Sequence, residues 1–372
     1  MARALILISI IFSGHIFAKP TLKAQDLLIY ALKYGYGAIE YFPNPFFEKV
    51  FSKLRNIKPT TVSNLCVQID DTLWEITDDH LIVRHQGSFC GKLRKKKFFS
   101  KPAVGNNLLS RKDPKSSAVT YRKVNKNKIP VLSISRFPDR KSKSWDGFID
   151  TLKQIKEESK ALIVDMRGNG GGDDTISEEW AELFYGGTYP TPILKTISKV
   201  SPARYALRAN SIKLQLLNYK SNNETPPPFL NKQYLDRIKK MKLAKSGKLD
   251  SKSVKNFHQK GKFIPKKGFN KPIYFLVDRR CASSCEHTLE YFEAHPKRKV
   301  FGENTAGLIH FGDTGRLILP YSGIDILISV KYLKYKDGRF AERKGYTPDV
   351  MLKNGEDALD SALKDIQNRH KL

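Results

Sequence analysis

Residues 129–187 read IPVLSISRFPDRKSKSWDGFIDTLKQIKEESKALIVDMRGNGGGDDTISEEWAELFYGG. The apolar run at 129–137 predicts a strand, and 145–159 places apolar residues at helical spacing. A second apolar run at 160–168 and a second amphipathic stretch at 177–187 repeat this order. Strand, helix, strand, helix in succession predicts a layered α/β core, in which helices cover a sheet.

The same pattern returns further along the chain. A predicted strand at 271–278 leads into a predicted helix at 283–296. The pattern then predicts strands at 299–303, 315–320 and 324–335 and a C-terminal helix from Gly355. We therefore expect one core domain over 129–372.

A basic stretch, 191–271, interrupts this core. It holds 20 lysines and arginines against three acidic residues and includes three prolines at 226–228. We expect an inserted, partly helical lid or surface module. The whole chain has a formal net charge of +29, which predicts attraction to anionic surfaces such as those of a cell envelope. The basic residues follow no nucleic-acid motif, so we expect no specific nucleic-acid partner.

The N-terminal part has a different character. Residues 1–18 combine a basic start at Arg3, an apolar run and a small-residue end, which predicts a secretory signal peptide cleaved after Ala18. An uncleaved N-terminal anchor is the alternative. No later stretch is apolar enough to span a bilayer, so we expect an exported protein, periplasmic or extracellular.

Two further segments lie between the signal and the core. Residues 19–60 predict an N-terminal helical segment with a proline break. Residues 61–128 predict a small β-rich subdomain, with short strands at 63–70, 72–78 and 80–86 before a basic, turn-rich stretch at 91–128.

The chain has four cysteines, Cys66, Cys90, Cys281 and Cys285, an even number that fits disulfides in an exported protein. Their order favours pairing of Cys66 with Cys90, and Cys281 either pairs with Cys285 or stays free. Their spacing does not match a zinc site, and we expect no metal or other cofactor.

Two turns carry residues that could perform chemistry. In 164–174, VDMRGNGGGDD, glycines follow a buried strand and let backbone N–H groups point into a cleft, as in a phosphate loop or an oxyanion hole. A plain tight turn is the alternative, and no Lys-Ser/Thr pair of a Walker loop follows. In CASSCE, 281–286, two serines precede a helix, where either one is a nucleophile or a helix cap.

Four motifs in this order resemble the C-terminal-processing (tail-specific) and tricorn-type serine peptidases: DMRGNGGG at 165–172, VDRRCASSCE at 277–286, GENTAG at 302–307 and ERKGYTPDV at 342–350. The resemblance implies a crotonase/ClpP-like layered α/β core and an endopeptidase acting on proteins or peptides. It implies Ser283 as nucleophile, three residues before Glu286. It also implies an oxyanion hole from the Ser284 backbone and the glycine loop at Gly171 and Gly172.

The base is where the sequence departs from the tail-specific pattern, because Leu308 stands where that branch has its lysine. The tricorn branch uses a histidine near the N-terminus and a glutamate before the Gly-x-x-Pro-Asp motif. By this resemblance His80, after Asp78 and Asp79, is the expected base, and Glu342, three residues before Gly345, supports it.

Other histidines stay open as the base: His310, His287 and His85. Glu342 is alternatively a solvated loop acid, and we expect Asp349 to fix a turn. The family also includes binding proteins, so a catalytically inactive protein that binds peptides or lipophilic ligands is the second hypothesis. The chain shows no glycine-rich segment of the kind found in a PDZ module.

Overall fold

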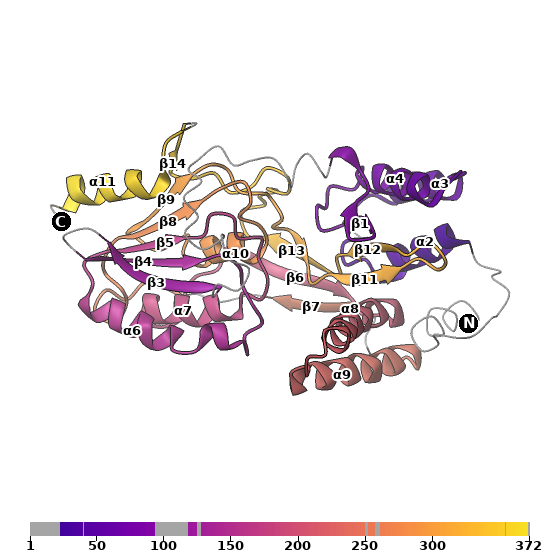
Figure 1. The fold of residues 1–372 in the computed structure, drawn as a ribbon, viewed down its shortest axis with the longest axis horizontal. Helices are drawn as coiled ribbons and strands as arrows, with labels where there is room; N and C mark the ends of the chain where they lie inside the picture. The colour runs from indigo at the N-terminus through magenta and orange to yellow at the C-terminus, as the bar shows by residue number, and fades with distance from the viewer. Residues whose placement is uncertain are drawn as a thin grey trace. The chain divides into compact units, whose positions relative to one another are not determined.

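The computed structural model describes residues 23–39, 41–93, 118–124, 128–249, 252–256, 261–353 and 355–370. The predicted signal peptide and most of the stretch 91–128 lie outside these residues. The chain divides into two compact units, each built from three separate stretches (Figure 1). The first unit comprises 1–100, 195–256 and 310–334, and the second comprises 101–194, 257–309 and 335–372.

The second unit is built on a six-stranded sheet. Its strands, in spatial order, are β14 (Val350–Met351), β9 (Arg298–Gly302), β8 (Ile273–Val277), β5 (Leu162–Asp165), β4 (Ile129–Ile134) and β3 (Val119–Val124). Neighbours from β14 to β4 pair in parallel, and β3 pairs antiparallel with β4. Its helices are α6 (Phe148–Glu158), α7 (Thr175–Tyr185), α10 (Ser284–Tyr291), α11 (Ala358–His370) and the short 3-10 helix η1 (Lys143–Trp145).

Helices cover both faces of this sheet because successive strand residues point to opposite sides. Leu162 and Val164 of β5 pack in one core cluster with α6, α7 and α10, whereas Ile163 packs in another with α11. Figure 1 accordingly shows α6 and α7 on one side of the sheet and α11 on the other. The predicted layered α/β core is confirmed.

The first unit contains two four-stranded sheets. One has the order β11 (Gly315–Ile318), β12 (Ile324–Ile328), β1 (Ile82–His85), β2 (Ser88–Phe89), and the other β10 (Phe311–Gly312), β13 (Lys331–Tyr335), β6 (Ile193–Lys199), β7 (Lys252–Asn256). Its helices are α2 (Ala24–Gly35), α3 (Asn44–Arg55), α4 (Val62–Leu73), α8 (Pro202–Ser221) and α9 (Pro228–Lys245). Helices α2 and α3 confirm the predicted N-terminal helical segment.

The strands predicted at 63–70 and 72–78 are wrong. Residues 62–73 form α4, whose first turn is capped by Thr61 Oγ1 accepting the Asn64 N–H at 3.0 Å. Leu65, Ile69 and Leu73 are buried at intervals of four residues, so a helical stripe was mistaken for strand alternation. Turns follow α4, and the strand predicted at 80–86 is present as β1.

The basic stretch 191–271 is partly helical, as predicted, because it contains α8 and α9. It also supplies β6 and β7, and residues 195–256 belong to the first unit. Its role as a lid and the predicted boundaries after residues 18, 60 and 128 stay predictions.

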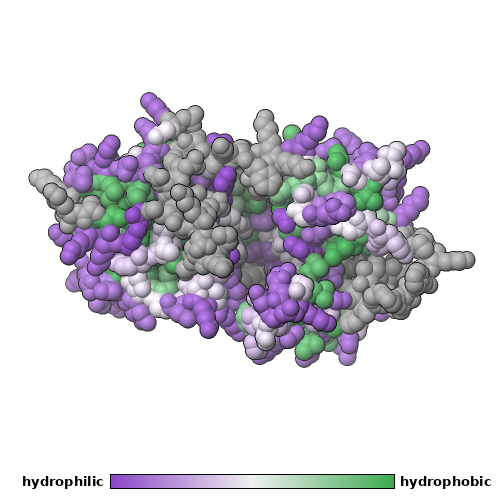
Figure 2. Space-filling view, viewed as in Figure 1, coloured by the Kyte–Doolittle hydropathy of each residue, from purple (hydrophilic) through white to green (hydrophobic). Residues whose placement is uncertain are grey.

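All four cysteines form disulfides, Cys66 with Cys90 and Cys281 with Cys285. In the view of Figure 2, hydrophilic residues make up most of the described surface, in keeping with the charged composition. Among the described residues, no helix has both the length and the apolar character needed to cross a membrane.

Candidate active site

Ser283 occupies an unusual backbone position between β8 and α10. Its φ and ψ are 56° and −118°, a region that residues other than glycine seldom adopt. Within the fully described stretch 281–292, every residue except Ser283 is buried. Strain of this kind costs on the order of 1–3 kcal/mol and persists at sites where a side chain must be presented in one direction. The strained backbone therefore holds one half-buried serine in a stretch whose other residues are buried.

Glu286, in the first turn of α10, anchors the turn at residues 281–286, which we call the serine loop. Its carboxylate accepts hydrogen bonds from the Ser283 N–H at 3.0 Å and from the Gly307 and Leu308 N–H groups at 2.8 Å each. The Thr305 hydroxyl donates to the same carboxylate. Burial, the largest influence, raises the pKa of Glu286, although these four donors act in the opposite direction. Glu286 thus ties Ser283 to the segment 302–308.

The glycine loop lies directly beside Ser283. A Cβ placed on Gly171, whose φ is +93°, would come within 2.6 Å of the Ala282 carbonyl oxygen and 2.9 Å of the Ser283 Cβ. Only glycine allows the two loops to approach this closely. The sequence motif at 165–172 and the serine motif at 277–286 therefore meet in the folded chain.

Asn169, which the sequence analysis did not single out, joins these loops. Its side chain donates to the Ile134 carbonyl at 2.9 Å and accepts the Gly171 N–H at 2.8 Å. Its carbonyl accepts the Ala282 N–H at 3.0 Å. The sequence offered only its place inside a glycine run, because the burial that obliges the amide to find hydrogen-bond partners is known only from the folded chain.

The two serines of the motif have different surroundings. The Ser284 hydroxyl donates to the Gly172 carbonyl at 2.7 Å and is buried, so it holds the glycine loop in place. The Ser284 N–H lies at the first position of α10, where no intrahelical acceptor exists. The Gly171 N–H already donates to Asn169, which leaves the backbone of Ser284 and Gly172 as the better donors toward a bound anion.

Leu308 and Ile309 connect the serine loop, residues 281–286, to Glu342. Leu308 donates its N–H to Glu286, and Ile309 donates its N–H to the Glu342 carboxylate at 3.0 Å. Glu342 is buried, so the interpretation as a solvated loop acid is wrong. Asp349 accepts the Val300 N–H at 2.8 Å and so ties the end of the motif to β9, and its predicted role in a turn stays a prediction.

The candidate bases are distributed over both units. In the second unit, His287 is buried, and its Nδ1 lies 3.1 Å from a Glu290 carboxylate oxygen. In the first unit, His310 is buried with its Nδ1 3.2 Å from the Leu333 carbonyl oxygen, and His85 lies on β1 opposite Ile324.

His80 belongs to the first unit and lies in the turn before β1. Its N–H donates to Asp78 Oδ1 at 2.8 Å, and its Nδ1 lies 3.9 Å from the same oxygen. Asp78 and Asp79 are fully buried. Of the predicted site residues, Ser283, Ser284, Gly171, Gly172 and Glu342 lie in the second unit, whereas His80 lies in the first.

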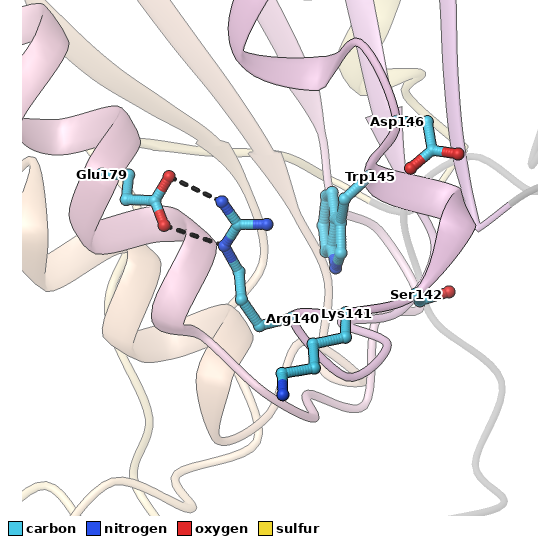
Figure 3. A pocket seen from close by; sticks show the side chains of 6 residues that line it. All are labelled: Arg140, Lys141, Ser142, Trp145, Asp146 and Glu179. Atoms are coloured by element: carbon cyan, nitrogen blue, oxygen red, sulfur yellow. Dashed lines mark hydrogen bonds and ion pairs between the residues drawn. The ribbon is translucent and has the colours of Figure 1, made fainter. Parts of the chain in front are cut away.

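A loop after β4 braces the glycine loop from its far end. The Phe137 N–H donates to the Gly171 carbonyl at 3.0 Å, and the Arg140 N–H donates to Asp173 at 3.0 Å. Arg140 also binds Glu179 of α7 through two hydrogen bonds (Figure 3). The adjoining cavity has a volume of about 460 Å³ and is lined mainly by charged side chains around Trp145. A pocket that binds an apolar side chain of a ligand would instead be lined mostly by hydrophobic residues.

Comparison with known proteins places this geometry in a family context. Residues 128–352, more than half of the chain, match the profile of Peptidase family S41. No curated protein sequence matches the chain.

Solved structures with TM-scores above 0.5 share the fold at low identity. A peptidase candidate from Parabacteroides merdae is 16% identical, with a TM-score of 0.57, over 92% of this chain and 96% of the other. A mutant of CPAF is 12% identical, with a TM-score of 0.52, over 93% and 95%. The photosystem II D1 C-terminal processing protease is 11% identical, with a TM-score of 0.45, over 90% and 94%.

Proposed function

The chain belongs to Peptidase family S41, and we propose that it is an active serine endopeptidase in which Ser283 is the nucleophile, His80 the base and Glu342 a supporting acid. One observation carries the proposal above the others. Ser283 is held in a strained conformation at the start of α10, half-buried among fully buried neighbours and beside the glycine loop. A serine that only capped a helix would need neither the strain nor the glycine contact.

The proposed reaction is acyl transfer from a peptide to the serine and then to water. His80 accepts the Ser283 hydroxyl proton as Oγ attacks the scissile carbonyl carbon, and the same proton then goes to the leaving amine. The Ser284 and Gly172 N–H groups donate to the oxyanion, and Gly171 joins them if its bond to Asn169 opens. Water, activated by His80, then hydrolyses the acyl-enzyme.

We propose His80 because its place in the Asp78-Asp79-His80 segment resembles that of the histidine in the tricorn-type branch, and two observations disfavour other bases. Leu308 has no atom that accepts a proton, which removes the lysine of the tail-specific branch. His287 lies on the same helical turn as Ser283 and is engaged by Glu290, whereas a base has to approach the hydroxyl from an independent segment. His310 and His85 remain as alternatives, and Glu342 is expected to orient or polarise the site.

A matched pair of serine variants tests the proposal. Ser283→Ala is expected to lower hydrolysis of an unfolded protein substrate at least about 1,000-fold, with an unchanged melting temperature. Ser284→Ala keeps its backbone donor and loses only the bond to Gly172, so we expect a fall of about tenfold or less. Retained hydrolysis in Ser283→Ala would overturn the assignment.

The second candidate is a binding protein without catalysis, and Leu308 is the observation that favours it. This candidate predicts that the wild-type protein retains a peptide or lipophilic ligand and hydrolyses no substrate. Hydrolysis that disappears in both Ser283→Ala and His80→Ala would exclude it.

We also propose that the protein acts outside the cytoplasm, in the periplasm or beyond the cell. Two disulfides fit an oxidising compartment, and residues 1–18 carry the pattern of a signal peptide. Protein or peptide substrates follow from the family. The basic helices α8 and α9 are proposed to contact an anionic envelope surface.

A further inference from the structure

We infer that Asp78 is a positioning residue, which holds the His80 imidazole in the orientation that proton transfer from Ser283 requires. The inference rests on the proposed role of His80 as the base. It concerns contacts inside the first unit alone, among Asp78, His80, Tyr36 and Ser329.

The turn that contains Asp78 and His80 brings the carboxyl group close to the imidazole ring. Asp78 Oδ1 accepts the His80 N–H at 2.8 Å and lies 3.9 Å from the His80 Nδ1. The backbone bond fixes the start of the side chain and keeps the carboxyl group 3.9 Å from Nδ1, a distance of ion-pair contact and not of a hydrogen bond. A carboxylate on the Nδ1 side favours the tautomer with its proton on Nδ1, so that Nε2 can accept a proton, and it stabilises the imidazolium that forms.

The Asp78 carboxyl group has surroundings that differ from those of an ordinary turn residue. Asp78 is fully buried, and the hydroxyls of Tyr36, which follows α2, and Ser329, which follows β12, both lower its pKa. The Gly37 N–H donates to the Ser329 carbonyl at 2.9 Å, which joins these two segments. A turn-forming aspartate needs only its bond to the backbone and is usually solvated. Burial among two hydroxyls indicates a carboxylate held for another purpose.

Burial changes the protonation equilibrium of the Asp78 carboxyl group. Burial, the largest influence, raises the pKa of Asp78 from 3.8 to about 6, and the neighbouring Asp79 acts in the same direction. The Ser329 hydroxyl, the His80 N–H and the Tyr36 hydroxyl lower it. The folded chain therefore binds this proton more tightly than the unfolded chain. The resulting stability is fully present below pH 3.8 and is lost as the pH rises through about 6.

A carboxylate kept ionised at neutral pH in this place thus weakens the fold, and function explains why it is there. The test uses Asp78→Asn, with Asp79→Asn as the matched control, since Asp79 is an equally buried carboxylate one residue away. We expect kcat of Asp78→Asn to fall about 100- to 10,000-fold with KM changed less than about threefold.

The stability readout separates positioning from a structural role. At pH 7 the melting temperature of Asp78→Asn should equal or exceed that of the wild type, and the gain in stability that the wild type shows between pH 7 and pH 5 should shrink. Asp79→Asn should keep kcat within about tenfold. A kcat of Asp78→Asn within threefold of wild type would overturn the inference, as would a kcat loss accompanied by a lower melting temperature.

Two further variants keep the inference testable if Asp78→Asn does not fold. Tyr36→Phe and Ser329→Ala each remove a hydroxyl that favours the ionised carboxyl group, so the acidic limb of the kcat/KM profile should move to higher pH. An unmoved limb in both would contradict the inference. His80→Ala distinguishes the levels: activity retained there refutes the proposed base, whereas activity lost there but retained in Asp78→Asn refutes only the role of Asp78.

Discussion

At the scale of single residues, the proposed nucleophile differs from the neighbouring serine in its surroundings. Ser283 and Ser284 are chemically alike, yet Ser283 is only half-buried, while Ser284 is buried and its hydroxyl is bonded to Gly172. The resemblance to the peptidase family implied Ser283, three residues before Glu286, and this choice stays a prediction; the structure shows that Glu286 accepts the Ser283 N–H. The Glu286 carboxylate accepts four hydrogen bonds and so fixes the position of residues 281–286. A buried acceptor of this kind is costly to remove, because its donors would then lack partners.

Gly171 offers the sharpest test at this scale, with Gly170 as its control. Gly171→Ala would push a Cβ to 2.6 Å from the Ala282 carbonyl oxygen at a φ of +93°. We expect stability to fall by about 1–3 kcal/mol and kcat by about 100-fold or more, because the serine loop must shift.

A Cβ on Gly170 meets no atom within 4 Å, so Gly170→Ala should leave both quantities within about twofold and 0.5 kcal/mol. Thermal unfolding and steady-state kinetics of the two variants give the comparison. Equal effects in Gly170→Ala and Gly171→Ala would contradict the close approach of the two loops.

At the scale of elements, sequence patterns were informative where one element has one environment. The strands of the second unit read as continuous apolar runs because both faces of their sheet are covered. Helix α4 was missed because its buried positions, Leu65, Ile69 and Leu73, leave a short polar–apolar alternation between them. Asn169 was missed because its role depends on loops that meet only after folding.

The two disulfides allow a prediction about elements. Cys66–Cys90 joins α4 to the residue after β2 across 24 positions, whereas Cys281–Cys285 spans four positions around Ser283. Loop-closure entropy predicts a loss of about 3 kcal/mol for Cys66→Ser/Cys90→Ser and about 2 kcal/mol for Cys281→Ser/Cys285→Ser.

Activity should respond in the reverse order, because only the second pair flanks the nucleophile. Thermal unfolding and kcat of the two double variants, measured on the folded proteins, check both rankings. A larger fall in kcat for Cys66→Ser/Cys90→Ser would show that the Cys281–Cys285 bond does not hold Ser283 in position.

At the scale of the whole molecule, the chain interleaves its two units. The motif order along the sequence predicted the α/β sheet, and it could not predict that residues 195–256 and 310–334 join the N-terminal part. Such assembly depends on contacts between distant segments, which local patterns do not record. The proposed nucleophile and base come from different units, so the proposed reaction requires both.

The basic surface gives a prediction at the same scale. Lys239 and Lys242 of α9 are exposed, as are Lys153 and Lys160 in the second unit. Lys239→Glu/Lys242→Glu should weaken co-sedimentation with vesicles containing anionic lipid, and raising the salt from about 0.05 to 0.2 M should weaken that of the wild type.

Lys153→Glu/Lys160→Glu changes the net charge by the same amount and serves as the control. Binding should fall clearly less in this variant than in the α9 variant. Equal losses in the two would indicate that overall charge, and not the α8–α9 region, attracts the surface.

Covalent labelling with a fluorophosphonate probe, read by mass spectrometry of the modified peptide, tests most directly whether Ser283 is a nucleophile activated by His80. We predict one modification, on Ser283, and no labelling of Ser283→Ala. The labelling rate should fall at least about 100-fold in His80→Ala and stay unchanged in His85→Ala. An unlabelled wild-type protein, a label on another residue, or labelling of His80→Ala at the wild-type rate would contradict this prediction.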